Sequence, residues 1–158
     1  MNKKLLQINT TGNFNATGRI AEDIGVIAQR NGYESYIALG RSKRQSANEL
    51  ITIGNKVDIF SHVALTRLFD AHGLGSKQAT LEFVKKLSKL NPTIVHLHNL
   101  HGYYLNYRFL FQYLNNTDIP CVWTFHDCWP ITGHCAHFMS VECDKWERGC
   151  HDCELKNE

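Results

Sequence analysis

The chain has 158 residues, of which 43% are hydrophobic and 20% are charged. These values are typical of one ordinary globular domain. The formal net charge of +2 is too small to indicate a nucleic-acid-binding protein. No run of about 18 apolar residues predicts a transmembrane helix, and residues 1–12 lack the apolar core of a signal peptide. We therefore expect a cytoplasmic protein that does not bind nucleic acid.

Short apolar segments alternate with segments of helical periodicity along the whole chain. The predicted strands span residues 5–9, 33–39, 50–53, 93–97 and 121–125. The predicted helices span residues 19–30, 57–69, 78–90 and 105–114. We expect Gly32 to end the first helix in a left-handed conformation and Ser76 to cap the third. The alternation predicts an α/β fold, a Rossmann-like parallel sheet with helices on both faces, followed by a C-terminal cysteine-rich loop.

The first predicted strand is followed by a loop that contains Gly12 and Gly18 and leads into a helix. Backbone N–H groups at a helix N-terminus favour an anionic or hydroxyl-rich ligand. The loop has neither the glycine pattern of a dinucleotide site nor the lysine of a P-loop, and a plain turn explains it equally well. The short basic segment 41–44 is interpreted as a solvated loop.

The fourth predicted strand ends in HLHNLHGYY, residues 96–104. His96 and His98 share one face of the strand, because side chains alternate. One interpretation is a small metal-dependent hydrolase that uses His96, His98 and His126. We favour the other, in which His96 is buried in the sheet while His98 and Asn99 line the crevice at the carboxyl ends of the strands. A metallohydrolase needs further ligands from other strands, and the sequence indicates none.

The fifth predicted strand is followed by His126 and Asp127. Open α/β sheets bind their ligands at the carboxyl ends of the strands, where these two residues are expected. A neutral imidazole can act as a base or bind a hydroxyl, and a neighbouring carboxylate can orient it. The alternative is that His126 is structural and only holds the cysteine-rich loop against the sheet.

All six cysteines lie in the last quarter of the chain, five of them between residues 128 and 153. A closed tetrahedral zinc site is predicted from the spacing of four of them, Cys135, Cys143, Cys150 and Cys153. The candidates to replace one ligand are Cys128, His134 and His151. Disulfides formed after purification and reduced buried thiols are the alternatives, and a redox role for the last pair is weaker because that pair does not open a helix. A polar loop gains folding energy from a metal, which favours structural Zn²⁺.

Three segments and the tail carry a family resemblance. The segments are TGNFNATGRIAEDIG (11–25), PTIVHLHNLHGYYLN (92–106) and VWTFHDCWPITGHC (122–135), and the tail is CDKWERGCHDC (143–153). Together they resemble the N-terminal half of a GT-B glycosyltransferase of the family 4 type, from a cysteine-containing branch encoded in bacterial surface-polysaccharide clusters. The resemblance covers essentially the whole chain.

The resemblance implies a protein with two Rossmann-like halves that bind different substrates. Residues 1–125 correspond to the N-terminal domain and residues 126–158 to a cysteine-rich loop of the same domain. This half holds a glycan or lipid-linked acceptor, and the missing C-terminal half, supplied in cis or in trans, holds the nucleotide sugar. The chain is therefore expected to be inactive alone and to associate peripherally with the inner membrane. The runner-up is a non-enzymatic, zinc-containing α/β binding module.

The resemblance also assigns site residues by position. His126 and Asp127 correspond to the catalytic positions. The substrate-binding positions are Gly12, Thr17, Gly18, Arg19, His98, Asn99, His101 and Tyr103.

Overall fold

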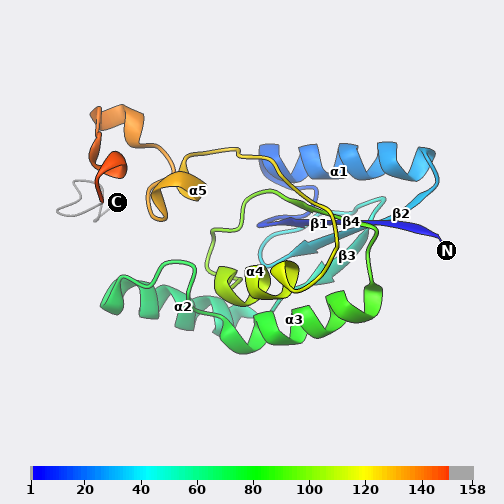
Figure 1. Cartoon of the computed structure of the whole chain (residues 1–158), viewed down its shortest axis with the longest axis horizontal. Coiled ribbons are helices and arrows are strands. Elements are labelled where there is room, and N and C mark those ends of the chain that lie inside the picture. The colour runs from blue at the N-terminus through cyan, green and yellow to red at the C-terminus, as the bar shows by residue number, and fades with distance from the viewer. Residues whose placement is uncertain (1, 150–158) are drawn as a thin grey trace. The chain divides into compact units, whose positions relative to one another are not determined.

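The structure is a computed structural model that describes residues 2–149, and it has the predicted alternation of strands and helices (Figure 1). The strands are β1 (Lys3–Asn9), β2 (Tyr33–Leu39), β3 (Glu49–Thr52), β4 (Ile94–Leu97) and β5 (Cys121–Trp123). The helices are α1 (Asn15–Arg30), α2 (Lys56–Phe69), α3 (Lys77–Leu90), α4 (Tyr107–Asn115) and α5 (Trp129–Thr132). Two 3-10 turns follow, η1 (Phe138–Val141) and η2 (Lys145–Glu147).

The five strands form one sheet in the order β3-β2-β1-β4-β5, and every neighbouring pair is parallel. Helix α1 covers one face of this sheet, and α3 and α4 cover the other (Figure 1). This arrangement confirms the predicted Rossmann-like α/β fold. Because all strands run in one direction, the loops that follow them meet at one edge, where such folds bind ligands.

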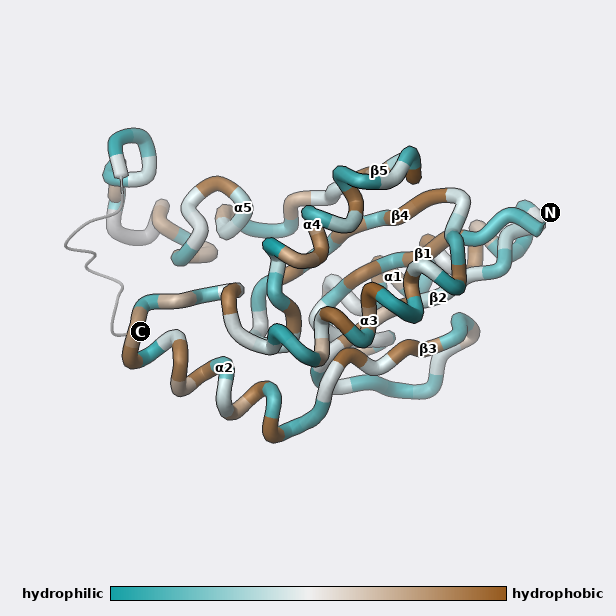
Figure 2. The backbone as a smooth tube through the Cα atoms, turned by 60° about the horizontal axis from the view of Figure 1, so that its bottom comes forward, coloured by the Kyte–Doolittle hydropathy of each residue, from teal (hydrophilic) through white to brown (hydrophobic). Residues whose placement is uncertain are grey.

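The strands β1 and β4 lie at the centre of the sheet, and Figure 2 shows hydrophobic stretches along both. Leu6 and Ile8 of β1 are fully buried, and Ala21 of α1 packs against Ile37 and Leu39 of β2. Burial of this apolar surface on both faces drives the assembly of the layers. The strands are therefore fixed in register beneath the site that their carboxyl ends form.

The observed element boundaries differ from the predicted ones at a few places. Helix α1 begins at Asn15, four residues earlier than expected, and β5 ends at Trp123, two residues earlier. Gly32 has a φ of +82°, which confirms the predicted left-handed helix end. Ser76 occupies the N-cap of α3 as predicted, but its side chain makes no capping hydrogen bond there.

The chain divides into two compact units, residues 1–124 and 125–158. The first contains the sheet and the helices α1–α4. In the described part of the second, the Cys128 N–H donates to the Ala136 carbonyl at 2.9 Å, and the Phe138 and Trp146 rings stack at 5.3 Å. Within residues 2–149, none of the helices combines the length and apolarity needed to span a membrane.

Candidate functional site at the carboxyl edge of the sheet

The loops after β1 and β4 are joined by a buried asparagine. Asn9 is fully buried, and its Oδ1 accepts from the Asn99 N–H at 3.3 Å. Its Nδ2 donates to the Thr11 carbonyl at 2.9 Å. One side chain at the end of β1 thus satisfies backbone groups of both loops and holds them together.

Asn99 lies at the centre of this edge with its side chain available to a ligand. Its carbonyl accepts from the Tyr104 hydroxyl at 2.9 Å and lies 3.1 Å from the Thr10 hydroxyl, which is 2.7 Å from the His101 carbonyl. These contacts fix its backbone. Its partly exposed side-chain amide makes no hydrogen bond within residues 2–149. A side-chain amide that can both donate and accept, on a backbone held in place, suits a sugar hydroxyl.

Three glycines allow the loops to pack this closely. Gly102 has a φ of +119°, and a Cβ atom on it would lie 2.7 Å from Thr10 Cγ2. A Cβ on Gly12 would lie 2.7 Å from Leu39 Cδ2, and one on Gly18 would lie 2.8 Å from Thr11 Oγ1. Packing alone therefore explains Gly12 and Gly18, and their role in substrate binding stays a prediction.

The basic segment 41–44 is also part of this edge. The Arg41 N–H donates to the Thr10 carbonyl at 3.0 Å, the Gly12 N–H donates to the Ser42 carbonyl at 3.1 Å, and the Arg44 N–H donates to the Gly12 carbonyl at 3.0 Å. The side chains in this segment are exposed, as expected of a solvated loop. The hydrogen bonds nevertheless place its three cations beside the glycine loop, which the interpretation from sequence missed. Because β1 and β2 are parallel neighbours, the loops that follow them lie side by side. A prediction of this pairing could have indicated that segment 41–44 lies beside the glycine loop.

The structure brings the other predicted substrate-binding positions to the same edge. Thr17 and Arg19 lie near the N-terminus of α1, where Thr17 Oγ1 is 3.5 Å from Asn9 Nδ2 and Arg19 is exposed. His101 and Tyr103 follow β4 and are both partly buried. The first unit thus places the predicted set on the loops after β1 and β4 and at the start of α1, and no ligand contact tests their roles.

The two sheet histidines have the reverse of the expected burial. His98 is 1% exposed, and its Nε2 lies 3.0 Å from Gln7 Oε1. Gln7 Nε2 donates to the Ala21 carbonyl at 2.7 Å, so its oxygen faces His98 and accepts the Nε2 proton. His96 is only partly buried, stacks on His98 at 4.2 Å and has its Nε2 2.8 Å from Thr124 Oγ1.

This geometry gives the hydrolase alternative no support. A catalytic metal site of this kind needs about three converging protein ligands. Residues 2–149 contain no group of three or more His, Cys, Asp or Glu side chains arranged to hold a metal ion. His96 of β4 and His98, which directly follows this strand, instead form a stacked pair.

A histidine that the sequence did not indicate supports the loop after β4. His62 of α2 accepts from the Gly75 N–H through Nε2 at 3.1 Å, so its Nδ1 carries the proton and faces Ser76 Oγ at 3.0 Å. Ser76 Oγ donates in turn to the Tyr103 carbonyl at 3.2 Å. The Tyr103 ring lies 5.6 Å from the His62 ring and 5.2 Å from the His72 ring. This chain of contacts holds Tyr103 at its unusual φ of +65°.

We expect His62 to make the fold sensitive to acid. The ring is 1% exposed, and burial lowers its pKa from 6.5 to about 4. Because the pKa is lower in the folded state, His62 contributes its full stability above pH 6.5, and this contribution is lost as the pH falls towards 4. We expect a loss on the order of 2 kcal/mol over this range.

Urea unfolding at a series of pH values, compared between the wild type and His62→Gln, measures this contribution. The difference in unfolding free energy between the two proteins should shrink as the pH falls. A difference that stays constant with pH would show that His62 does not titrate in the fold as its burial implies.

The predicted catalytic and metal positions lie in the second unit. Asp127 Oδ1 accepts from the Trp129 N–H at 3.0 Å and so holds the start of α5, while His126 is partly buried. Cys135 and Cys143 are partly buried, and Cys150 and Cys153 lie outside the described residues. The zinc site and the catalytic roles therefore stay predictions.

The Rossmann-like sheet and the polar loops at its carboxyl edge define an α/β domain of the kind that binds ligands at this edge. Residues 18–152 match the family model of Glycosyltransferase Family 4, and the chain belongs to this family. It is similar to a protein of Escherichia coli (strain K12), WcaC, which is provisionally named a colanic acid biosynthesis glycosyl transferase. The two are 26% identical over 165 residues, which cover 97% of this chain and 40% of that relative. No solved structure matches the chain.

Proposed function

We propose that the chain is the acceptor-side half of a GT-B glycosyltransferase, which transfers a sugar from a nucleotide-sugar donor to a glycan or lipid-linked acceptor. The observation that carries the proposal is the family match over residues 18–152. The chain spans 40% of the length of its relative, which is consistent with a donor-binding half that lies elsewhere. The name of that relative refers to polysaccharide biosynthesis, and we extend this role to the chain.

In this proposal, different residues of the first unit bind different parts of the substrates. The side-chain amide of Asn99 binds a sugar hydroxyl, and the exposed cations Arg41, Lys43 and Arg44 attract phosphate groups of the acceptor or the donor. Positioning of this kind lowers the barrier by holding the acceptor hydroxyl where the donor carbon arrives. In our proposal His126 takes the proton of that hydroxyl or contacts the transferred sugar, and Asp127 orients the histidine.

A kinetic comparison of two asparagine variants tests this proposal. In the complete enzyme, Asn99→Ala should raise the KM for the acceptor about tenfold, since a hydrogen bond to a sugar hydroxyl is lost. The KM for the donor should change little. Asn116→Ala, at the exposed end of α4, is the matched control and should leave both constants unchanged. An Asn99→Ala enzyme with the wild-type KM for its acceptor would contradict the assignment.

We also propose that Cys135, Cys143, Cys150 and Cys153 bind one structural Zn²⁺. The two described cysteines of this set are partly buried, Cys135 between α5 and η1 and Cys143 between η1 and η2, and thiolates are the ligands that structural zinc prefers. In this part of the chain, the described residues bury little apolar surface, so a metal would supply folding energy there. The zinc ion has no place in the chemistry of transfer.

Elemental analysis of the reduced protein checks this proposal. We expect about one equivalent of zinc, which Cys143→Ser should lose and Cys121→Ser should keep, because Cys121 lies in β5 outside the set. A zinc content below about a tenth of an equivalent in the reduced wild type would leave disulfides or buried thiols as the explanation.

We place the complete enzyme in the cytoplasm, at the face of the inner membrane. A lipid-linked acceptor is held in that membrane, so a peripheral protein can reach it without a spanning helix.

A further inference from the structure

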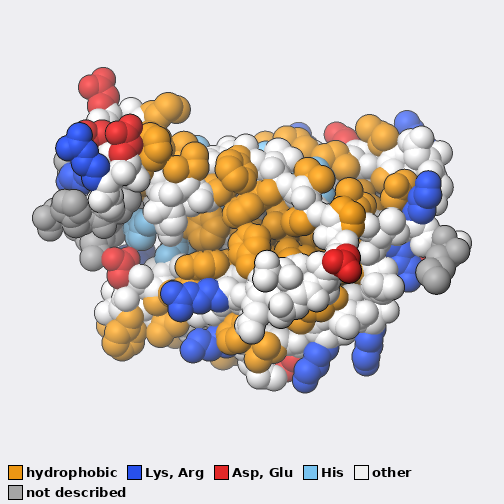
Figure 3. Space-filling model, in the orientation of Figure 1, with side chains coloured by type: hydrophobic (Ala, Val, Ile, Leu, Met, Phe, Trp, Pro, Cys, Tyr) orange, Lys and Arg blue, Asp and Glu red, His pale blue; other side chains and the backbone are white. Residues whose placement is uncertain are grey.

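Helix α2 is the least covered helix of the first unit. His62 is its one buried residue. Four large apolar side chains on this helix are between 72% and 75% exposed, Val57, Phe60, Leu68 and Phe69. Hydrophobic side chains are accordingly visible on the surface over α2 (Figure 3). An exposed apolar surface of this kind on a globular protein usually marks a surface that is covered by a partner, a ligand or a membrane.

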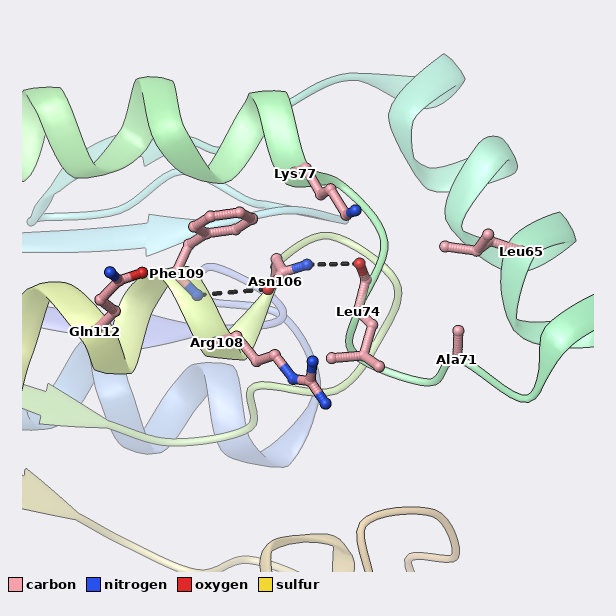
Figure 4. A pocket seen from close by; sticks show the side chains of 8 residues that line it. All are labelled: Leu65, Ala71, Leu74, Lys77, Asn106, Arg108, Phe109 and Gln112. Carbon is pink, nitrogen blue, oxygen red and sulfur yellow. Dashed lines mark hydrogen bonds between the residues drawn. The ribbon is translucent and has the colours of Figure 1, made fainter.

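A cavity of about 460 Å³ lies where the chain turns back from α2 into α3 and meets α4 (Figure 4). Its apolar wall is formed by Leu65, Ala71, Leu74 and Phe109. Two cationic side chains, Lys77 and Arg108, line it as well, and Figure 4 shows Leu74 and Asn106 between them. The size and the mostly apolar wall are those of a pocket for a small organic ligand.

Hydrogen bonds hold the cavity in shape. Asn106 is 2% exposed, and its Nδ2 donates to the Leu74 carbonyl at 2.5 Å, while its Oδ1 accepts from the Phe109 N–H at 3.4 Å. The Tyr107 N–H donates to the Gly73 carbonyl at 3.1 Å. The α2–α3 loop and the start of α4 are thus locked together, and the pocket exists without a ligand.

The positive charges of the cavity are not compensated within residues 2–149. Lys77 is the first residue of α3 and Arg108 the second of α4, where the helix dipole disfavours a cation. Neither side chain has a hydrogen bond or an ion pair among the described residues. The Ser76 hydroxyl is used by His62 and Tyr103, so no side chain caps the N-terminus of α3. An anion in the cavity would compensate both cations and the helix end together.

We propose that this cavity binds a phosphate ester that carries an apolar chain. Lys77 and Arg108 hold the phosphate, and the chain lies against Leu65, Leu74 and Phe109 and continues along the exposed face of α2. The inference deepens the proposed function, on which it rests for the identity of the ligand as the lipid part of a lipid-linked acceptor. A hydrophilic glycan has neither the phosphate nor the apolar chain that this cavity recognises.

Titration of the full 158-residue chain with octyl phosphate, followed by ¹H–¹⁵N NMR, tests the proposal. The amide signals of residues 65–80 and 106–112 should shift, with a higher affinity than for octyl glucoside, which lacks the charge, or for inorganic phosphate, which lacks the chain. Lys77→Gln combined with Arg108→Gln should weaken octyl phosphate binding about tenfold or more. Lys85→Gln combined with Lys86→Gln removes the same charge from exposed positions of α3 and should leave the affinity unchanged.

Three results would overturn the proposal. The first is an equal affinity of the two double variants for octyl phosphate. The second is an equal affinity of the wild type for octyl glucoside and octyl phosphate. The third is a set of shifts confined to residues 56–62, which would indicate adsorption to α2 alone. Amide spectra of the variants without ligand show whether each remains folded. Leu65→Ser provides a second variant, in which affinity for octyl phosphate should fall while that for inorganic phosphate stays the same.

Vesicles distinguish the two sources of such a phosphate. Binding to vesicles of phosphatidylcholine with phosphatidylglycerol, lost in the Lys77→Gln and Arg108→Gln double variant, identifies a bilayer phospholipid. Binding of octyl phosphate without binding to these vesicles identifies a single lipid-linked phosphate. These assays contain no sugar nucleotide and measure no transfer. A negative result therefore contradicts the lipid-phosphate site and says nothing against the proposed glycosyltransferase function. Conversely, a failure of sugar transfer in the complete enzyme says nothing against ligand binding in the cavity.

Discussion

His126→Ala in the complete enzyme is expected to reduce sugar transfer about 100-fold or more, while the protein stays folded. The reason is its position in the chain: His126 comes three residues after Trp123, the last residue of β5, and parallel α/β folds place their chemistry on the segments that follow the carboxyl ends of strands. A base or hydroxyl-binding group contributes to catalysis only when it is held in place. Asp127 is itself fixed by the Trp129 N–H, which limits the movement of its neighbour. Steady-state transfer rates at saturating substrates measure the effect.

The matched control is His137→Ala, which removes an exposed histidine from the same unit. Its rate should equal that of the wild type. Melting temperature and zinc content are measured for both variants. If His126→Ala lowers both, and activity falls only in proportion to the folded protein that is lost, then His126 is structural and its catalytic assignment is wrong.

The second large effect concerns the 158-residue chain alone, which should show no detectable sugar transfer. Transfer needs the donor and the acceptor held together and the leaving diphosphate stabilised. In our proposal the chain supplies only the acceptor side. The same chain joined to the donor-binding half should turn over nucleotide sugar. Release of nucleoside diphosphate, measured for both proteins with the same acceptor, provides the comparison.

An unfolded sample would also be inactive, so folding is checked separately. The isolated chain should give a cooperative melting transition and dispersed amide signals. Robust turnover of any sugar nucleotide by the isolated chain would contradict the proposed division between two halves.

The fold was predictable from the local sequence pattern because residues that end helices and strands, such as glycine, lie at the boundaries of its elements. Strand β2 was predicted to the residue, since Gly32 and Gly40 flank an apolar run. The start of α1 was missed because Asn15 and Ala16 are polar or small and carry no periodic apolar signal. The early end of β5 has a similar cause: Thr124 and Phe125 suit a strand but lie beyond its last paired residue.

The site was only partly predictable, because most of its contacts join distant parts of the chain. The location of Asn99 and His101 at this edge was predictable, since both follow the end of β4 closely, while their roles stay predictions. The support of Tyr103 by His62 could not be found, because 41 residues separate them and one histidine on a helix carries no signal. The buried His98 has Gln7 of the neighbouring strand β1 as its partner. This contact could be predicted only if the order and the register of the strands were known.

The cavity beside α2 is a further feature that local pattern cannot reveal. It is assembled from the end of α2, the loop after it and the first turn of α4. In the sequence, Lys77 and Arg108 are two ordinary surface cations. Their placement at the N-termini of two neighbouring helices is evident only once the fold is known.

Separate equilibrium titrations of the 158-residue chain with the acceptor and with the sugar nucleotide of the complete enzyme test the central claim most directly. We expect the chain to bind the acceptor, with the signals of residues 9–12, 41–44 and 98–103 shifting, and Asn99→Ala to weaken this binding about tenfold. The sugar nucleotide should bind far more weakly. Binding of the sugar nucleotide as tight as that of the acceptor, or tighter, would contradict the assignment of this chain to the acceptor side.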